Sequence, residues 1–190
     1  MTCELAWKPP SKPFEPRAAK DALREPANAL EIVGMKASIT LFVELVMLPL
    51  ARAAEDLKGV PRVLDGDTLE LAGVHVRLEA IDGPERDQVC LTGEGECSRC
   101  GEEARDRLAE KIGSQRIACR PAGKDRYGRT LADCRAGETD LNAWLVHESW
   151  ALSFVRYGDP YRGEEDEARE HERGLWAGAF IAPWDWRHRS

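Results

Sequence analysis

The sequence predicts an α+β fold in which a five-stranded OB-type β-barrel is combined with three α-helices. Alternating apolar and polar residues between glycine-containing turns predict the strands, and apolar residues at helical spacing predict the helices. The resulting order is strand-strand-strand-helix-strand-strand-helix-helix. Five short strands with a helix between the third and the fourth are typical of an OB barrel. The length of 190 residues, 43% of them hydrophobic, suits one such domain with an appendage.

The first three strands come from the segment VPRVLDGDTLELAGVHVRLEAID, which alternates between apolar and polar residues. The dipeptides D-G and A-G interrupt the alternation and predict turns. We therefore expect strands at Val60–Leu64, Thr68–Leu71 and Val74–Ile81. The third strand must end at Gly83-Pro84, because proline has no N–H for the ladder of the sheet.

The segment EEARDRLAEKI predicts a helix over Glu102–Ile112, with acidic residues in its first turn and Lys111 in its last. Two further strands follow on either side of a turn-rich DRYGR segment, and two further helices follow them. We expect these strands at Arg116–Arg120 and Arg129–Arg135, and these helices from Thr139 or Asp140 to Glu148 and from Tyr161 to Glu172. Five tryptophans are assigned to packing and tail docking, namely Trp144, Trp150, Trp176, Trp184 and Trp186.

The first 53 residues differ from the rest of the chain. Residues 1–34 are rich in proline without a sustained apolar period, and we expect them to be disordered or to result from an over-extended start. Residues 35–53 have a short basic start, an apolar region and a small-x-small exit, which is typical of a secretory signal peptide. A soluble amphipathic helix and a retained membrane anchor are the alternatives. The sequence therefore predicts a domain at 54–190 that is secreted or periplasmic.

The cysteines favour an oxidising compartment. Cys119 and Cys134 end two apolar runs that are expected to be neighbouring antiparallel strands, so a disulfide between them is geometrically reasonable. Cys97-Ser-Arg-Cys100 has the spacing of a zinc or redox site, but no second such pair and no nearby histidine pair completes it. We expect a Cys90–Cys100 bridge instead, which leaves Cys97 without an assigned partner.

The formal net charge of -7 argues against binding nucleic acid through bulk charge. Any recognition of phosphate must therefore come from a local cluster of arginines. Arg77 lies on the strand that leads to Asp82, and Arg129 starts a strand after a turn. Taken alone, each is an ordinary surface charge, but two arginines beside a carboxylate cluster would clamp a phosphodiester.

Two acidic turns flank strands that are expected to pair, and each turn taken alone is more simply a capped turn with solvated charges. Their pairing would bring Asp67 and Asp82 together at one rim of the barrel. Two neighbouring carboxylates repel each other, and a hard divalent cation removes the conflict. Calcium accepts about six to eight oxygen ligands, including backbone carbonyls and water. We therefore expect a Ca²⁺ site formed by Asp67, Asp82 and the carbonyl of Gly83.

Hydrolysis of a phosphodiester needs a cation, charge stabilisation on the phosphate oxygens and an activated water. Glu85 lies beside Asp82 and can take the proton of that water. The expected catalytic residues are therefore Arg77, Glu85 and Arg129. A non-catalytic OB module that binds single-stranded nucleic acid or another anion is the alternative, and a disulfide-braced calcium-binding protein is a third possibility.

The motifs VLDGDTLEL, VRLEAIDGPE and DRYGR, in this order and spacing, resemble those of the staphylococcal nuclease (thermonuclease) family. The resemblance covers about Val60 to Arg187 and is closest to an exported bacterial branch with extra cysteines. It implies an OB barrel with three helices and calcium-dependent cleavage of DNA and RNA, giving 3′-phosphate products. It also implies the metal and catalytic roles given above.

The resemblance further implies that Tyr127 contacts a phosphate or sugar next to the cleaved bond and that Tyr157 flanks a base pocket. Single-stranded or locally melted nucleic acid is the expected substrate of a monomer that has no membrane contact in its mature form. Two departures stand out, because the family commonly has threonine or alanine at Gly83 and glycine at Ser149.

Overall fold

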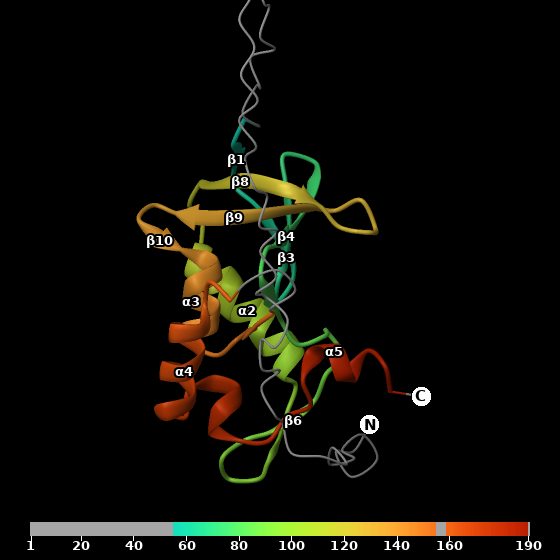
Figure 1. Cartoon of the computed structure of the whole chain (residues 1–190), viewed down its shortest axis with the longest axis vertical. Helices are drawn as coiled ribbons and strands as arrows, with labels where there is room; N and C mark the ends of the chain where they lie inside the picture. The colour runs from blue at the N-terminus through green and yellow to red at the C-terminus, as the bar shows by residue number, and fades with distance from the viewer. Residues whose placement is uncertain (1–54, 155–158, 190) are drawn as a thin grey trace, which may run out of the picture. The chain divides into compact units, whose positions relative to one another are not determined.

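The computed structural model describes residues 55–154 and 159–189 (Figure 1). The predictions for residues 1–34 and 35–53 and for Tyr157 therefore lie outside the described residues. Within the described ranges, no helix is long and apolar enough to cross a membrane.

A mixed sheet forms the centre of the fold, with the strand order β1-β8-β9-β4-β3-β2 and β10 paired to β9. Its pairs are antiparallel except for β4 and β9, which run parallel. The bounds of these strands are β1 Leu57–Gly59, β2 Arg62–Asp65, β3 Thr68–Leu71, β4 Val74–Leu78, β8 Ile117–Lys124, β9 Thr130–Ala136 and β10 Thr139–Asp140.

One predicted strand is divided in the structure, and an unpredicted strand precedes the first. The first predicted strand is present as β2, and the unpredicted β1 lies before it, with the proline at position 61 between the two. The third ends at Leu78, and a separate strand β5 (Ile81–Asp82) follows it. Ala80 lies between them with a φ of 58°, which breaks the extended backbone. β5 then pairs with β11 (Leu152–Ser153) instead of continuing the ladder of β4.

The three predicted helices are present as α2 (Cys100–Ile112), α3 (Leu141–His147) and α4 (Arg162–Glu170). Asp140 caps α3, and its Oδ1 accepts the N–H of Ala143 at 3.0 Å. α2 lies beneath the sheet, and α3 and α4 follow one another on one side of the domain (Figure 1). The C-terminal part adds a 3₁₀ helix (Gly174–Ala177) and a short helix α5 (Pro183–Trp186), which the sequence did not predict.

The core lies between the sheet and these helices. The apolar side chains of β3 and β4, among them Leu69, Leu71 and Leu78, are fully buried. They pack with Leu108 of α2. The apolar residues at every second position of the strands and at helical spacing in α2 therefore face the same core. The α+β architecture predicted from the sequence is confirmed.

Ser149, where the family commonly has glycine, follows α3 with a φ of 57°. This left-handed conformation favours glycine, so the serine is held there at a cost in backbone strain.

Both predicted disulfides are present, Cys90–Cys100 and Cys119–Cys134. The second joins directly opposed residues of β8 and β9. A smaller sheet pairs β6 (Cys90–Leu91) with β7 (Cys97–Ser98), so the first lies where that sheet meets α2. No described cysteine is a free thiol, and this includes Cys97, which the sequence left unassigned.

Replacing Cys119 and Cys134 together by alanine should lower the free energy of unfolding. The bridge spans a separation of 15 residues, and closing a loop of that length stabilises a fold by about 3 kcal/mol. Urea unfolding of the double variant measures the loss. A far-UV circular dichroism spectrum like that of the wild type controls for the fold, and an unchanged unfolding midpoint would contradict the prediction.

Candidate functional site

The strand pairings bring the two predicted metal-binding aspartates together. β3 and β4 pair with Thr68 opposite Arg77, so Asp67, directly before β3, lies near the end of β4. The next strand, β5, ends in Asp82. Arg77 joins the two carboxylates, with Nη1 at 2.7 Å from Asp67 Oδ2 and Nη2 at 2.5 Å from Asp82 Oδ1. Asp67 is 5% exposed and Asp82 is fully buried.

Gly83 packs tightly against the other acidic turn. Its N–H donates to Asp67 Oδ2 at 3.2 Å. A Cβ at this position would lie 3.1 Å from the carbonyl carbon of Gly66, closer than most side chains tolerate. The glycine therefore allows the turn that carries Asp67 to lie against the one that carries Asp82.

Arg129 reaches the same cluster from the turn between β8 and β9. Its Nη1 donates to Thr68 Oγ1 at 3.5 Å, and this hydroxyl donates to Asp67 Oδ1 at 2.8 Å. Asp125 fixes the arginine, because its Oδ2 accepts Arg129 Nε at 2.7 Å and its Oδ1 accepts the backbone N–H of Arg129 at 2.9 Å. The sequence did not predict this orienting role of Asp125, although a short Asp-to-Arg spacing in a turn is the signal for it.

Tyr127 lies at the tip of the same turn and is 69% exposed. The guanidinium groups of Arg126 and Arg129 lie 4.7 Å and 5.7 Å from the centre of its ring. The ring is therefore held by cation–π contacts while most of its surface faces solvent.

The other end of the cluster contains a residue that the sequence analysis missed, Arg187 just after α5. Its Nη2 lies 2.5 Å from Asp82 Oδ2, and its Nη1 lies 3.1 Å from Asp82 Oδ1 and 2.5 Å from Glu85 Oε1. Glu85 is further fixed through its backbone N–H, which donates to Gln88 Oε1 at 3.1 Å. The sequence analysis gave this arginine no role, because nothing in the residues around it indicates which distant segment it contacts.

Burial and neighbouring charges both shift the pKa values of groups in this cluster, and they act in opposite directions on Asp82 and Arg77. Burial raises the pKa of Asp82, while the hydrogen bonds from Arg187 and the charge of Arg77 lower it. Burial raises the pKa of Asp65 to about 6, and the charges of Asp67 and Glu85 act in the same direction. Burial lowers the pKa of Arg77, but the two aspartates outweigh it, and the net shift is upward.

These side chains surround one large cleft of about 1320 Å³. The predicted residues that line it are Asp67, Arg77, Gly83, Glu85, Tyr127 and Arg129. Asp82 lies behind them, where the guanidinium groups of Arg77 and Arg187 cover it. A chain of hydrogen bonds and ion pairs thus links Arg129 to Glu85 through both aspartates.

The donors of this cluster suit a hard cation. Asp67 and Asp82 offer carboxylate oxygens from adjacent turns, and the neighbouring backbone adds carbonyl oxygens, which calcium accepts together with water. In the described ranges, no group of three or more histidines, cysteines, aspartates or glutamates is arranged to hold a metal ion. The candidate side-chain ligands of a cation are therefore the two carboxylates of Asp67 and Asp82. A cation that binds Asp82 would compete with Arg187 for the same oxygens.

The loop that carries Glu85 is held against the start of α2 by Gly101. A Cβ at position 101 would lie 1.8 Å from the carbonyl oxygen of Glu85, so Gly101→Ala should displace this loop. Overpacking of this kind costs about 1 to 3 kcal/mol of stability. We expect urea unfolding to show this loss and any activity that depends on Glu85 to fall with it.

Gly163→Ala in α4 is the matched control, because nothing lies within 4 Å of a Cβ there. It should leave the site unchanged and stabilise the helix by up to about 1 kcal/mol. If Gly101→Ala and Gly163→Ala had the same stability and the same activity, the contact between Gly101 and Glu85 would not constrain the loop.

Comparison with known proteins gives one family and several relatives. The family model described as "Staphylococcal nuclease homologue" matches residues 75–178. The chain is 39% identical over 135 residues to the succinoglycan biosynthesis protein ExoI of Rhizobium meliloti (strain 1021), covering 70% of this chain and 71% of the relative. It is 34% identical over 178 residues to the micrococcal nuclease of Shigella flexneri, covering 84% of this chain and 95% of the relative. It is also 34% identical over 143 residues to an uncharacterized endonuclease of Escherichia coli O157:H7, covering 70% of this chain and 87% of the relative.

Proposed function

The chain belongs to the staphylococcal nuclease family and is a phosphodiester-hydrolysing nuclease, and from this premise we propose that it cleaves DNA and RNA with calcium as its cofactor. One observation carries the proposal. Two aspartates, three arginines and one glutamate from distant parts of the sequence are joined by hydrogen bonds and ion pairs along a single cleft.

Asp67, Asp82 and the backbone carbonyl of Gly83 would hold the calcium ion. Their oxygen donors fit its preference, and water and a phosphate oxygen would complete its coordination. When bound, the cation stabilises the negative charge that develops on the phosphate oxygens during cleavage. Thr68 and the N–H of Gly83 orient the Asp67 carboxylate for this role.

Arg77 and Arg129 would bind the phosphate that is cleaved. Each guanidinium is fixed by carboxylates, Arg77 by Asp67 and Asp82 and Arg129 by Asp125, so its remaining donors are oriented before the substrate arrives. Bidentate hydrogen bonds from arginine match the geometry of phosphate oxygens. Both residues would therefore neutralise charge as a pentavalent phosphorus forms.

Glu85 would act as the general base. Its carboxylate lines the cleft, and the loop beneath it is fixed by Gln88. It would accept a proton from a water molecule whose oxygen attacks phosphorus in line with the bond to the leaving oxygen. The bond from phosphorus to the 5′ oxygen then breaks, the 5′ oxygen takes up a proton from solvent, and the phosphate remains on the 3′ oxygen.

Tyr127 would contact the sugar or phosphate next to the cleaved bond, since its exposed ring stands at the edge of the cleft. Single-stranded or locally melted nucleic acid would fit this arrangement. We propose that the protein acts as a monomer outside the cytoplasm, secreted or periplasmic, where disulfides such as Cys119–Cys134 persist.

Incubation of the purified protein with plasmid DNA and with RNA, in calcium and then in excess chelator, tests the proposal. We expect both polymers to be cut in calcium only, and calorimetry to show that Asp67→Asn weakens calcium binding. The alternative of a non-catalytic OB module predicts a retained complex with uncut nucleic acid. Uncut polymers in calcium, at neutral and alkaline pH, would overturn the proposed function.

A further inference from the structure

The C-terminal segment that carries α5 is docked firmly beside the candidate site. Gln88 is fully buried, and its Nε2 donates to the carbonyl of Ile181 at 2.7 Å. Trp186 is buried as well, and its Nε1 donates to Asp87 Oδ1 at 3.3 Å. The loop that follows Glu85 and the C-terminal segment therefore hold each other in place.

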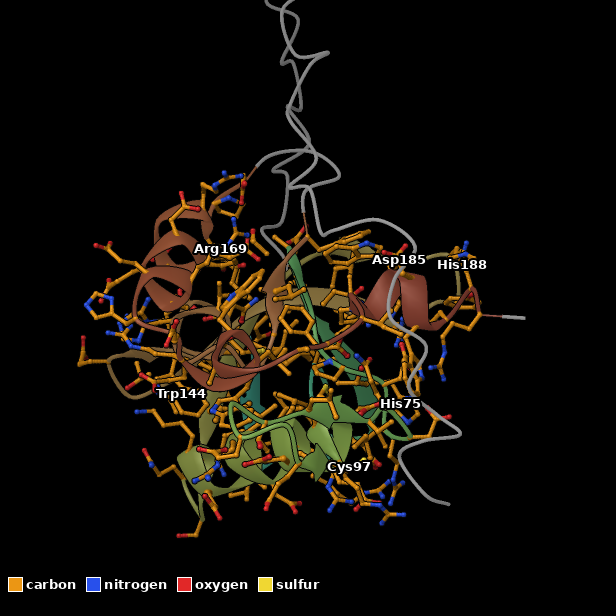
Figure 2. The ribbon with its side chains drawn as sticks, turned by 90° about the horizontal axis from the view of Figure 1, so that it is seen from below. His75, Cys97, Trp144, Arg169, Asp185 and His188 are labelled. Atoms are coloured by element: carbon orange, nitrogen blue, oxygen red, sulfur yellow. A yellow bond between two sulfur atoms is a disulfide. The ribbon has the colours of Figure 1, made fainter. Side chains whose placement is uncertain are left out.

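One face of this segment lines the cleft. Residues three and four positions apart share a face of a helix. Accordingly Trp184, Arg187 and His188 all line the cleft, whereas Trp186 is turned to the interior. Figure 2 labels His188 next to α5, on the side of the domain away from Trp144 and Arg169.

Trp184 is paired with a second aromatic ring in the cleft. The centres of the rings of Trp184 and Phe154 lie 5.6 Å apart, with an angle of 41° between their planes. Phe154 is positioned by its backbone N–H, which donates to the carbonyl of Ala80 at 2.9 Å beside β5. Both side chains are only partly buried, so the pair presents aromatic surface to the cleft.

An aromatic surface and a guanidinium group therefore lie side by side, one helical turn apart, next to Glu85. A nucleotide has the same two parts, a flat base and an anionic phosphate. We propose that Phe154, Trp184 and Arg187 form a subsite for one nucleotide next to the cleaved bond, in which the base stacks on the aromatic pair and the phosphate binds Arg187. The inference rests on the proposed function and deepens it.

Tyr127, at the tip of the hairpin formed by β8 and β9, also lines the cleft. In Figure 1 this hairpin turn and α5 lie on the same side of the domain. A strand that crosses the charged centre would thus meet an aromatic residue from each segment. Stacking on Trp184 requires an unpaired base, so the subsite favours single-stranded or locally melted substrate.

Two modifications of a short single-stranded oligonucleotide separate the two parts of the subsite. An abasic scan removes one base at a time, and a methylphosphonate scan removes the charge of one phosphate at a time. With the wild-type full chain in calcium, we expect one position near the cut at which the missing base lowers kcat/KM by about 5- to 100-fold, the range given by stacking of one base. A neutral phosphate at the neighbouring position should also lower kcat/KM.

We call the loss of kcat/KM caused by the missing base the base penalty, and the loss caused by the neutral phosphate the phosphate penalty. Each variant should abolish one of these penalties and keep the other. Trp184→Ala should cleave the intact strand as slowly as the wild type cleaves the abasic one, with no further loss at that position, while the phosphate penalty persists. Trp184→Phe should restore the base penalty. Arg187→Gln should abolish the phosphate penalty and keep the base penalty.

Phe154→Leu provides a second route to the same result if Trp184→Ala does not fold, because it removes a ring at nearly constant volume. Trp144→Ala is the matched control, since this ring lies under Lys111 and lines no part of the cleft, and it should keep both penalties. Unchanged penalties in both Trp184→Ala and Phe154→Leu, or a wild type without a position-specific base penalty, would overturn the subsite. A wild type that leaves the intact strand uncut would instead overturn the proposed function.

Discussion

Replacement of Glu85 by glutamine is expected to lower the rate of cleavage by about 10²- to 10⁴-fold, the contribution typical of a general base. Glutamine has nearly the same shape and can still accept the hydrogen bond that Arg187 donates to Glu85. It cannot take a proton from water at neutral pH. The loss should therefore appear in kcat, with little change in KM, in a steady-state assay on a single-stranded oligonucleotide.

Two measurements distinguish a catalytic effect of Glu85→Gln from a structural one. The unfolding midpoint of Glu85→Gln should stay close to that of the wild type, since the carboxylate is partly exposed. Glu110→Gln, which removes a charge from the exposed face of α2, should leave the rate unchanged. A glutamine variant that keeps a tenth or more of the wild-type kcat would exclude Glu85 as the base.

Replacement of Arg77 by methionine should cost about 3 to 5 kcal/mol of stability, because removing one member of a buried ion pair leaves the other charge uncompensated. Arg77 is the shared partner of Asp67 and Asp82, which are almost fully buried. Asp82 would keep Arg187, so most of the cost should fall on Asp67. Urea unfolding without calcium measures the change.

Arg62→Met is the matched control on the same sheet. Arg62 pairs with Glu70 across β2 and β3, but its side chain is 71% exposed, and exposed pairs contribute about 1 kcal/mol or less. If the loss of stability in Arg77→Met comes from the unpaired carboxylate of Asp67, then adding Asp67→Asn to this variant should recover part of the lost stability. Equal losses for Arg77→Met and Arg62→Met, or no recovery in the double variant, would contradict this explanation.

The parts of the site that were predicted come from turns and strands whose pairing is local. Asp67 directly precedes β3 and Arg77 lies on β4, and a short turn joins these two paired strands, so the sequence pattern predicts their proximity. Asp82 follows five residues after Arg77, and the two are bonded at 2.5 Å. The Cys119–Cys134 bridge was predictable for the same reason, because both residues belong to one hairpin.

The parts that were missed depend on where distant segments meet. Arg187 reaches Asp82 across 105 residues and Glu85 across 102, and no periodicity reports a contact of this range. Trp184 was assigned to packing because tryptophans at helical spacing more often bury area than stack on a base. The division of the third predicted strand was missed because alternation alone does not report a change of pairing partner.

The sequence by itself determined the main strands and the three longer helices, which carboxylates and arginines sit in turns, and which family the motifs resemble. These properties are set by side-chain period and turn chemistry over a few neighbouring residues. Only the tertiary structure decided the partner of each charge, the burial of Asp82 and the presence of Arg187 and Trp184 in the cleft. Contacts of this kind follow from the path of the whole chain, which brings α5 back to the loop after β5.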